Sequence, residues 1–369
     1  MRKSIILIAV VLLSLGFAPQ VDDENLIQIA LLLDTSNSMD GLINQAKAQL
    51  WNIVNEFALA RKYGKVPKLQ IALYEYGNNN LPKSDGYIRK VVDLTDNLDE
   101  ISEELFNLTT NGGEEFCGAV IDRAVRELSW SQRTDILKII FIAGNEPFTQ
   151  GSVNYKNACK LAISKGIIVN TIYCGNFNDG IRTSWKDGAD LADGMYSNID
   201  QDQQLTFIEA PQDKELSRLG QELNETYIPY GERGDKAKST QKAQDVKAEA
   251  LSLAVMAERS VSKASANYVN VDWDLVDAMS KDSTVVEKID KEQLPEKMQN
   301  MSIDEQKMLI RQNMEKRKQI QEKINKLNEE RRKYIEEQGK KNANDKLLNS
   351  AIIKSVRKQA QSKNYTFIK

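Results

Sequence analysis

The stretch LIQIALLLDTSNS, residues 26–38, decides the fold of this chain. Leu26 to Leu33 form a nearly continuous apolar run, which is typical of a parallel strand covered on both faces. The run ends at Asp34, and Ser36 and Ser38 follow on alternate positions. We therefore expect a buried central strand that carries a carboxylate and two hydroxyls at its carboxyl end.

Strand and helix patterns alternate from this run to about residue 230. Strand patterns cover residues 69–76, 87–92, 136–143, 167–174 and 195–198, and residues 87–92 follow 69–76 closely enough to pair antiparallel. Helical patterns cover residues 41–61, 98–108, 116–128, 155–164, 183–192 and 213–223. The alternation predicts a doubly wound α/β sheet, which binds ligands outside the carboxyl ends of its strands.

Asp34, Ser36 and Ser38 offer hard oxygen ligands, which suit Mg²⁺ or Mn²⁺. The spacing alone is weak, because Asp and Ser also cap the helix that follows such a loop. Its position after a buried strand and before an amphipathic helix makes a cation site the stronger interpretation. The alternative is a site without metal, in which Asp34 and Ser36 only bind backbone amides.

With this motif, residues 24–230 resemble the von Willebrand factor type A domain family. The resemblance implies a Rossmann-like domain with a mostly parallel sheet. It also implies a metal-ion-dependent adhesion site that opens with Asp34, Ser36 and Ser38. In that family an acidic group of the bound partner completes the shell of the ion, so the resemblance implies a protein or surface ligand.

The second and third loops depart from the family pattern. The second loop reads NGGEE over residues 111–115, with Glu114 where the family has Thr. The third reads AGNEP over residues 143–147, with Gly144 where the family has Asp. We expect Glu114 and Glu146 (or Asn145) to complete a more electronegative site for Mg²⁺, Mn²⁺ or Ca²⁺. Such a site holds a cation more strongly and leaves less positive charge for an acidic ligand.

The composition argues against an enzyme. The chain contains no histidine, which excludes Ser-His-Asp and Cys-His catalysis and histidine metal ligands. A hydrolase that uses Ser36, or the adjacent Glu114 and Glu115, is the weaker alternative. The three cysteines, Cys117, Cys159 and Cys174, permit one disulfide and one free thiol, or three buried thiols.

Residues 1–20 have the order of a secretory signal: Arg2 and Lys3, the apolar run Ile5 to Leu15, then small residues at Gly16 and Ala18. The run is too short to span a bilayer comfortably. We expect an exported protein of the periplasm, cell envelope or exterior, with no stable membrane span after cleavage.

Residues 231–369 form a charged, helix-forming extension. Within residues 303–337 a broken heptad places Ile310 and Ile324 at position a, and Ile320 and Leu327 at d, with Arg317 and Arg331 interrupting it. A helical hairpin, a helix packed on the domain and a self-associating coiled coil are all consistent with it. Its basic residues alternate with acids and lack interleaved aromatics, so nucleic acid is not an expected partner. The alternative function is a metal-independent scaffold subunit of an envelope assembly.

Overall fold

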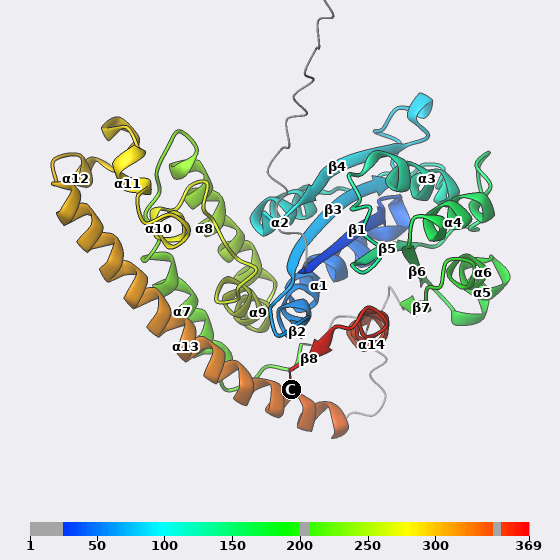
Figure 1. The fold of residues 1–369 in the computed structure, drawn as a ribbon. Helices are drawn as coiled ribbons and strands as arrows, with labels where there is room; N and C mark the ends of the chain where they lie inside the picture. The colour runs from blue at the N-terminus through cyan, green and yellow to red at the C-terminus, as the bar shows by residue number, and fades with distance from the viewer. Residues whose placement is uncertain (1–24, 200–206, 342–347, 369) are drawn as a thin grey trace, which may run out of the picture.

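A computed structural model describes residues 25–199, 207–341 and 348–368 and shows a six-stranded sheet between helices, with a helical region beside it (Figure 1). The strand order is β4-β3-β1-β5-β6-β7, and only β4 runs antiparallel to its neighbour. The expected doubly wound, mostly parallel α/β fold with a helical carboxyl-terminal region is therefore confirmed. The predicted signal at residues 1–20 lies outside the described residues.

Strand β1 (Leu26–Asp34) is the centre of the sheet. It pairs in parallel with β3 (Lys68–Tyr76) on one side and β5 (Leu137–Gly144) on the other, and all of its residues are buried. The outer strands are β4 (Ile88–Thr95), β6 (Ile167–Cys174) and β7 (Tyr196–Ile199). Burial on both faces explains why the sequence of β1 is almost wholly apolar.

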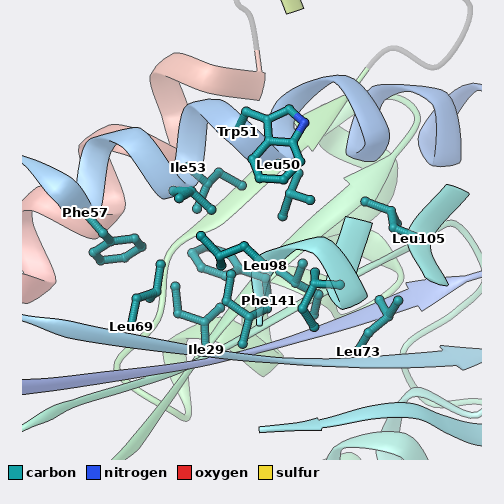
Figure 2. Packing of buried hydrophobic residues seen from close by; sticks show 14 of the residues in the cluster. Ile29, Leu50, Trp51, Ile53, Phe57, Leu69, Leu73, Leu98, Leu105 and Phe141 are labelled. Atoms are coloured by element: carbon teal, nitrogen blue, oxygen red, sulfur yellow. The ribbon is translucent and has the colours of Figure 1, made fainter. Parts of the chain in front are cut away.

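Each face of the sheet is covered by its own layer of helices. One face packs against α1 (Asp40–Ala58) and α2 (Leu98–Asn107), and Figure 2 shows Trp51 and Phe57 above Ile29 and Leu69. The other face packs against α3 (Cys117–Glu127), α4 (Tyr155–Ser164) and α6 (Trp185–Asp190), and α5 (Phe177–Arg182) lies beside α6 and β7. Cys117, Cys159 and Cys174 are buried free thiols, so of the two cysteine arrangements left open the structure shows three thiols.

The helical region is tied to the α1 face of the sheet. It contains α7 (Asp213–Asn224), α8 (Gly234–Leu251), α9 (Leu253–Lys263), α10 (Leu275–Lys281), α11 (Val285–Lys288), α12 (Glu296–Gln299) and α13 (Ile303–Lys341). Helix α9 packs on α1, α8 packs on α2, and α7 lies against both α9 and α13. No helix in the described ranges is long and apolar enough to cross a membrane.

Helix α13 is one continuous helix, and its broken heptad faces the chain itself. Ile310, Ile320 and Ile324 are buried against the neighbouring helices. The interrupting arginines have buried acidic partners: Arg317 pairs with Asp274 and Asp277, and Arg331 pairs with Asp213 and Glu258. Neither a hairpin nor a dimeric coiled coil is therefore needed to explain the pattern, because α7, α9 and α10 bury this side of α13.

The end of the extension returns to the sheet. Helix α14 (Leu348–Gln361) contacts α1 and β7, and β8 (Thr366–Phe367) pairs antiparallel with β2 (Ala60–Arg61). Gln359 of α14 and Asn170 of β6 exchange two buried hydrogen bonds of 3.0 and 2.7 Å. The hydroxyl of Tyr365 donates to the carbonyl oxygen of Leu26 at 2.9 Å. The end of the extension therefore packs directly against the sheet domain.

The substitution Tyr365→Ala tests this return. It should lower the free energy of unfolding by about 3–5 kcal/mol, because a fully buried aromatic ring is removed beside β1. Urea unfolding measures the loss, with Tyr63→Ala as the matched control, since Tyr63 is 75% exposed. Equal effects of the two substitutions would mean that the carboxyl terminus contributes nothing to the stability of the sheet.

Candidate cation site at the carboxyl end of β1

The site begins where β1 ends. Asp34 is the last residue of β1, and the backbone N–H of Thr35 donates to the carbonyl oxygen of Tyr76 at 2.9 Å. The chain then enters a short 3-10 helix (Asn37–Met39) and α1. The backbone N–H of Ser36 donates to Oδ1 of Asp34 at 2.7 Å. These bonds hold the Asp34 side chain, which is fully buried, at the edge of the sheet.

The first loop brings its three predicted ligands together. Oγ of Ser36 lies 3.3 Å from Oγ of Ser38, and Nδ2 of Asn145 donates to Oγ of Ser38 at 3.0 Å. Ser36 is buried and Ser38 is exposed. Ser36 precedes the 3-10 helix without capping it through its side chain, so a capping role does not account for its hydroxyl.

The second loop contributes Glu115 rather than the predicted Glu114. The Glu114 side chain is exposed, whereas Glu115 is only 4% exposed. A Cβ atom on Gly77 would lie 2.7 Å from Cγ of Glu115 and 2.8 Å from Oδ1 of Asp34, so both acidic side chains lie against the same side of Gly77. Sequence reasoning missed Glu115 because neighbouring side chains of an extended segment point to opposite sides, and the sequence does not say which faces inward.

Glycines allow the loops to approach this closely. Gly77 has a φ of +80°, a backbone conformation that favours glycine, and any side chain there would overlap Asp34 and Glu115. A Cβ atom on Gly113 would lie 2.5 Å from the carbonyl oxygen of Gly77. The pair of glycines therefore lets the second loop press the Glu115 carboxyl against Asp34.

The third loop cannot supply an acid at residue 144. A Cβ atom on Gly144 would lie 2.5 Å from Oη of Tyr76 and 3.0 Å from Oδ2 of Asp34. The Tyr76 hydroxyl, which donates to the carbonyl oxygen of Ala143 at 2.9 Å, fills that space. Glu146, the other predicted ligand, is exposed, and its carbonyl oxygen accepts a bond from Nε1 of Trp185.

Burial disfavours the state in which both acids of the site are ionised. Burial is the main cause that raises the pKa of Asp34. Burial, and then the bond to Asp34 and its charge, raise the pKa of Glu115 to about 10. The more distant charge of Glu146 raises both pKa values further. Without a cation the two carboxyls therefore share a proton at neutral pH.

The donor set fits a hard divalent cation. Apart from the proton that the pair shares, Oδ2 of Asp34 and Oε2 of Glu115 are buried and accept no hydrogen bond from the described chain. No lysine or arginine of the described ranges forms an ion pair with either acid. The described residues contain no group of three His, Cys, Asp or Glu placed to hold a metal, so hydroxyls and waters would complete the shell.

The raised pKa of Glu115 predicts how stability changes with pH in a chelator. A carboxyl whose pKa is higher in the folded than in the unfolded state stabilises the fold at low pH, and this contribution is lost as pH rises through the folded value. Urea unfolding at about pH 5 and about pH 9 should show a steeper loss of stability for the wild type than for Glu115→Gln, which has no proton to lose. Parallel losses would contradict the shared proton.

The substitution Gly144→Ala tests why the third loop lacks an acid. It should lower the free energy of unfolding by about 1–3 kcal/mol, because the new methyl group overlaps the Tyr76 hydroxyl. Combined with Tyr76→Phe, the loss should be smaller than the sum of the two single losses. Additive losses in urea unfolding of the four proteins would show that the hydroxyl is not the obstacle.

Comparison with known proteins identifies the domain. Residues 28–189 match the profile of the von Willebrand factor type A domain family, and no curated protein sequence matches the chain. Similar solved structures include the proximal thread matrix protein 1 from the mussel byssus with a zinc-occupied MIDAS motif (16% identity, 48% of this chain and 43% of that chain, TM-score 0.38). They also include the conserved hypothetical protein BatB from Bacteroides thetaiotaomicron (15% identity, 47% and 90%, TM-score 0.36).

The pilus adhesin SpaC from Lactobacillus rhamnosus GG is a further similar structure (14% identity, 48% of this chain and 28% of that chain, TM-score 0.36). The chain thus spans less than half the length of the mussel protein and of this adhesin. The profile match and the sheet topology together show that residues 28–189 form a von Willebrand factor type A domain.

Proposed function

We propose that this chain is an exported, non-enzymatic binding protein that holds another protein or a surface ligand through a divalent cation. The observation that carries the proposal is the buried pair of Asp34 and Glu115, whose Oδ2 and Oε2 atoms accept no hydrogen bond from any other residue of the described chain. An unpaired buried carboxylate is costly, and a cation removes that cost. Export is inferred from the signal-like order of residues 1–20.

The proposed ligands are Asp34, Ser36, Ser38 and Glu115. The two buried acids supply the negative charge that balances Mg²⁺, Mn²⁺ or Ca²⁺, and the hydroxyls supply neutral oxygen ligands. The acid that the family pattern places in the third loop is replaced by Glu115 from the second. When bound, the cation would offer its open positions on the exposed Ser38 side to an oxygen of the partner.

The rim of the site determines which partners it accepts. Glu114 and Glu146 are exposed beside the first loop and carry negative charge. The two inner acids already balance a divalent cation, so net positive charge does not attract an acidic partner. Direct coordination of one partner carboxylate must then outweigh repulsion from the rim, which favours a partner with a single acidic group among neutral or basic residues.

Binding agrees better with these surroundings than hydrolysis does. Ser36 contacts Ser38 and Asp34, and the chain has no histidine that could act as its base. Glu114 and Glu115 point to different environments, one exposed and one buried, rather than flanking a common cleft. The residues near the first loop therefore resemble a coordination site more than a nucleophile with its base.

A metal-independent scaffold is the second candidate function. A shared proton between Asp34 and Glu115 would let the site close without a cation, because the pair then carries a single negative charge. The helical region and the returning α14 would in that case serve only to shape a surface for assembly. The two candidates differ in one measurable property, which is the response of stability to cations.

A cation titration of the chelator-treated full chain decides between them. Mg²⁺, Mn²⁺ or Ca²⁺ at about 100 times its dissociation constant should stabilise the wild type by roughly 2.7 kcal/mol in thermal unfolding. Asp34→Ala and Glu115→Gln should abolish this shift, because each removes a charged ligand. Glu114→Gln is the matched control and should keep it, since that side chain is exposed.

Two results of this titration would contradict the proposed site. If no cation shifts the unfolding midpoint of the wild type, the metal-independent scaffold is the better description. If Glu115→Gln keeps the shift and Glu114→Gln loses it, the cation is held by the residue expected from the sequence pattern, and the second loop must rearrange on binding.

A further inference from the structure

A groove with a cavity volume of about 560 Å³ lies where the sheet domain meets the helical region. Its walls come from the last turns of α1, from α9 and from α13, and Ile368 closes one end. Figure 1 shows α13 passing below the end of α1 at this junction. Asn52 lies twelve residues after the start of α1, about 18 Å along the helix from the cation loop, so the groove is a separate feature.

Side-chain amides line the two long walls of this groove. Asn52 and Asn55 project from α1, and Gln321, Asn325 and Asn328 project from α13. The three positions on α13 are spaced by four and three residues, which places them on one face of the helix. The groove is therefore bordered by a row of groups that can both donate and accept hydrogen bonds.

Only one of these amides bonds to another part of the described chain. Asn55 donates to the carboxylate and to the backbone carbonyl oxygen of Glu258 at 2.6 and 2.9 Å, but its own carbonyl oxygen is buried and has no partner. We find no hydrogen bond from Asn52, Asn325 or Asn328 to another side chain or backbone group of the described ranges. Their hydrogen-bonding capacity is left for something that enters the groove.

Helix stability does not explain the amides either. Asparagine is one of the less favourable residues in a helix interior, whereas the other exposed positions of α13 are mostly Lys, Glu, Gln and Arg. Asn325 and Asn328 lie in the middle of this long helix and beside its buried seam. Asn325 is exposed and Asn328 is half-buried, so both amides are open to solvent and to a ligand in the groove.

The charges of the groove nearly cancel. Two of its acids are paired with arginines, the buried Glu56 with Arg357 and the half-buried Glu258 with Arg331. Glu329 remains on one wall, with Arg61 and Arg332 nearby. Apolar side chains also line the groove, namely Ala58, Leu59, Val66, Val261, Ala264 and Ala266. The occupant that suits this surface is an uncharged, hydrogen-bonding chain.

A polypeptide fits this surface better than a glycan. No aromatic ring lines the groove, so a sugar ring would have no face on which to stack. Peptide groups present one donor and one acceptor per residue, which is what a row of amides complements. From Gln321 to Arg332 the wall rises about 16 Å, the length of about five extended residues.

We propose that the groove between α1 and α13 binds an extended, uncharged polypeptide segment independently of the cation site. The amides of Asn52, Asn55, Gln321, Asn325 and Asn328 hydrogen-bond its backbone, and the alanines between them accept its small side chains. The protein would thus contact its surroundings at two places on opposite ends of α1.

Peptide selection on the full chain tests the groove. A display library of random twelve-residue peptides is panned on the wild type in chelator, and enriched peptides are synthesised for binding by fluorescence anisotropy. The wild type should enrich uncharged sequences, and the double variant Asn325→Ala/Asn328→Ala should bind them at least about tenfold more weakly. That variant should also unfold at a midpoint roughly 1–2 °C higher, because alanine favours the helix.

Asn313→Ala is the matched control in the same helix, outside the groove, where Nδ2 of Asn313 donates to the carbonyl oxygen of Leu309. It should leave peptide binding unchanged, and so should Asp34→Ala, which separates the groove from the cation site. A lower midpoint of the double variant would assign the amides a structural role. Failure to enrich peptides, equal binding to the double variant, or a preference of the wild type for neutral oligosaccharides would each overturn the proposal.

Discussion

Burial of β1 on both faces is the constraint from which the architecture of this protein follows. A strand with helices above and below is apolar along most of its length, and β1 carries its only acidic residue, Asp34, where it leaves the sheet. The same edge receives the loops that follow β3 and β5, so the buried Asp34 carboxylate lies where three segments converge. The geometry of the candidate site therefore depends on which groups of those segments contact the Asp34 carboxylate.

The packing of side chains at this edge of the sheet determines which acid contacts Asp34. Tyr76 occupies the space beside Gly144, so the third loop cannot bring an acid to Asp34. Two glycines in the other loops open room for Glu115 instead. In the site that we propose, a residue from a different loop thereby supplies the second inner carboxylate.

Buried arginines hold the helices of the helical region together through ion pairs. Arg259 pairs with Asp99 and Asp245 and lies over the ring of Trp51, which joins α9 to α2, α8 and α1. Arg317 and Arg331 attach α13 in the same way at its upper and lower halves. Breaking such a pair leaves an uncompensated buried charge, so these contacts specify one arrangement of the helices. The groove exists because this arrangement holds α13 at a distance from α1.

Periodicity by itself determined the elements of the domain, because apolar runs and helical spacings reflect local rules. It also determined that Asp34, Ser36 and Ser38 lie together, since they share one short loop at a strand end. The choice between Glu114 and Glu115 depends on the twist of an extended segment, which packing against Gly77 decides. The partner of the α13 seam and the return of α14 to β6 are also tertiary outcomes. A row of isoleucines on one side of a helix can pack against any apolar surface, and which surface it contacts is decided only in the folded chain.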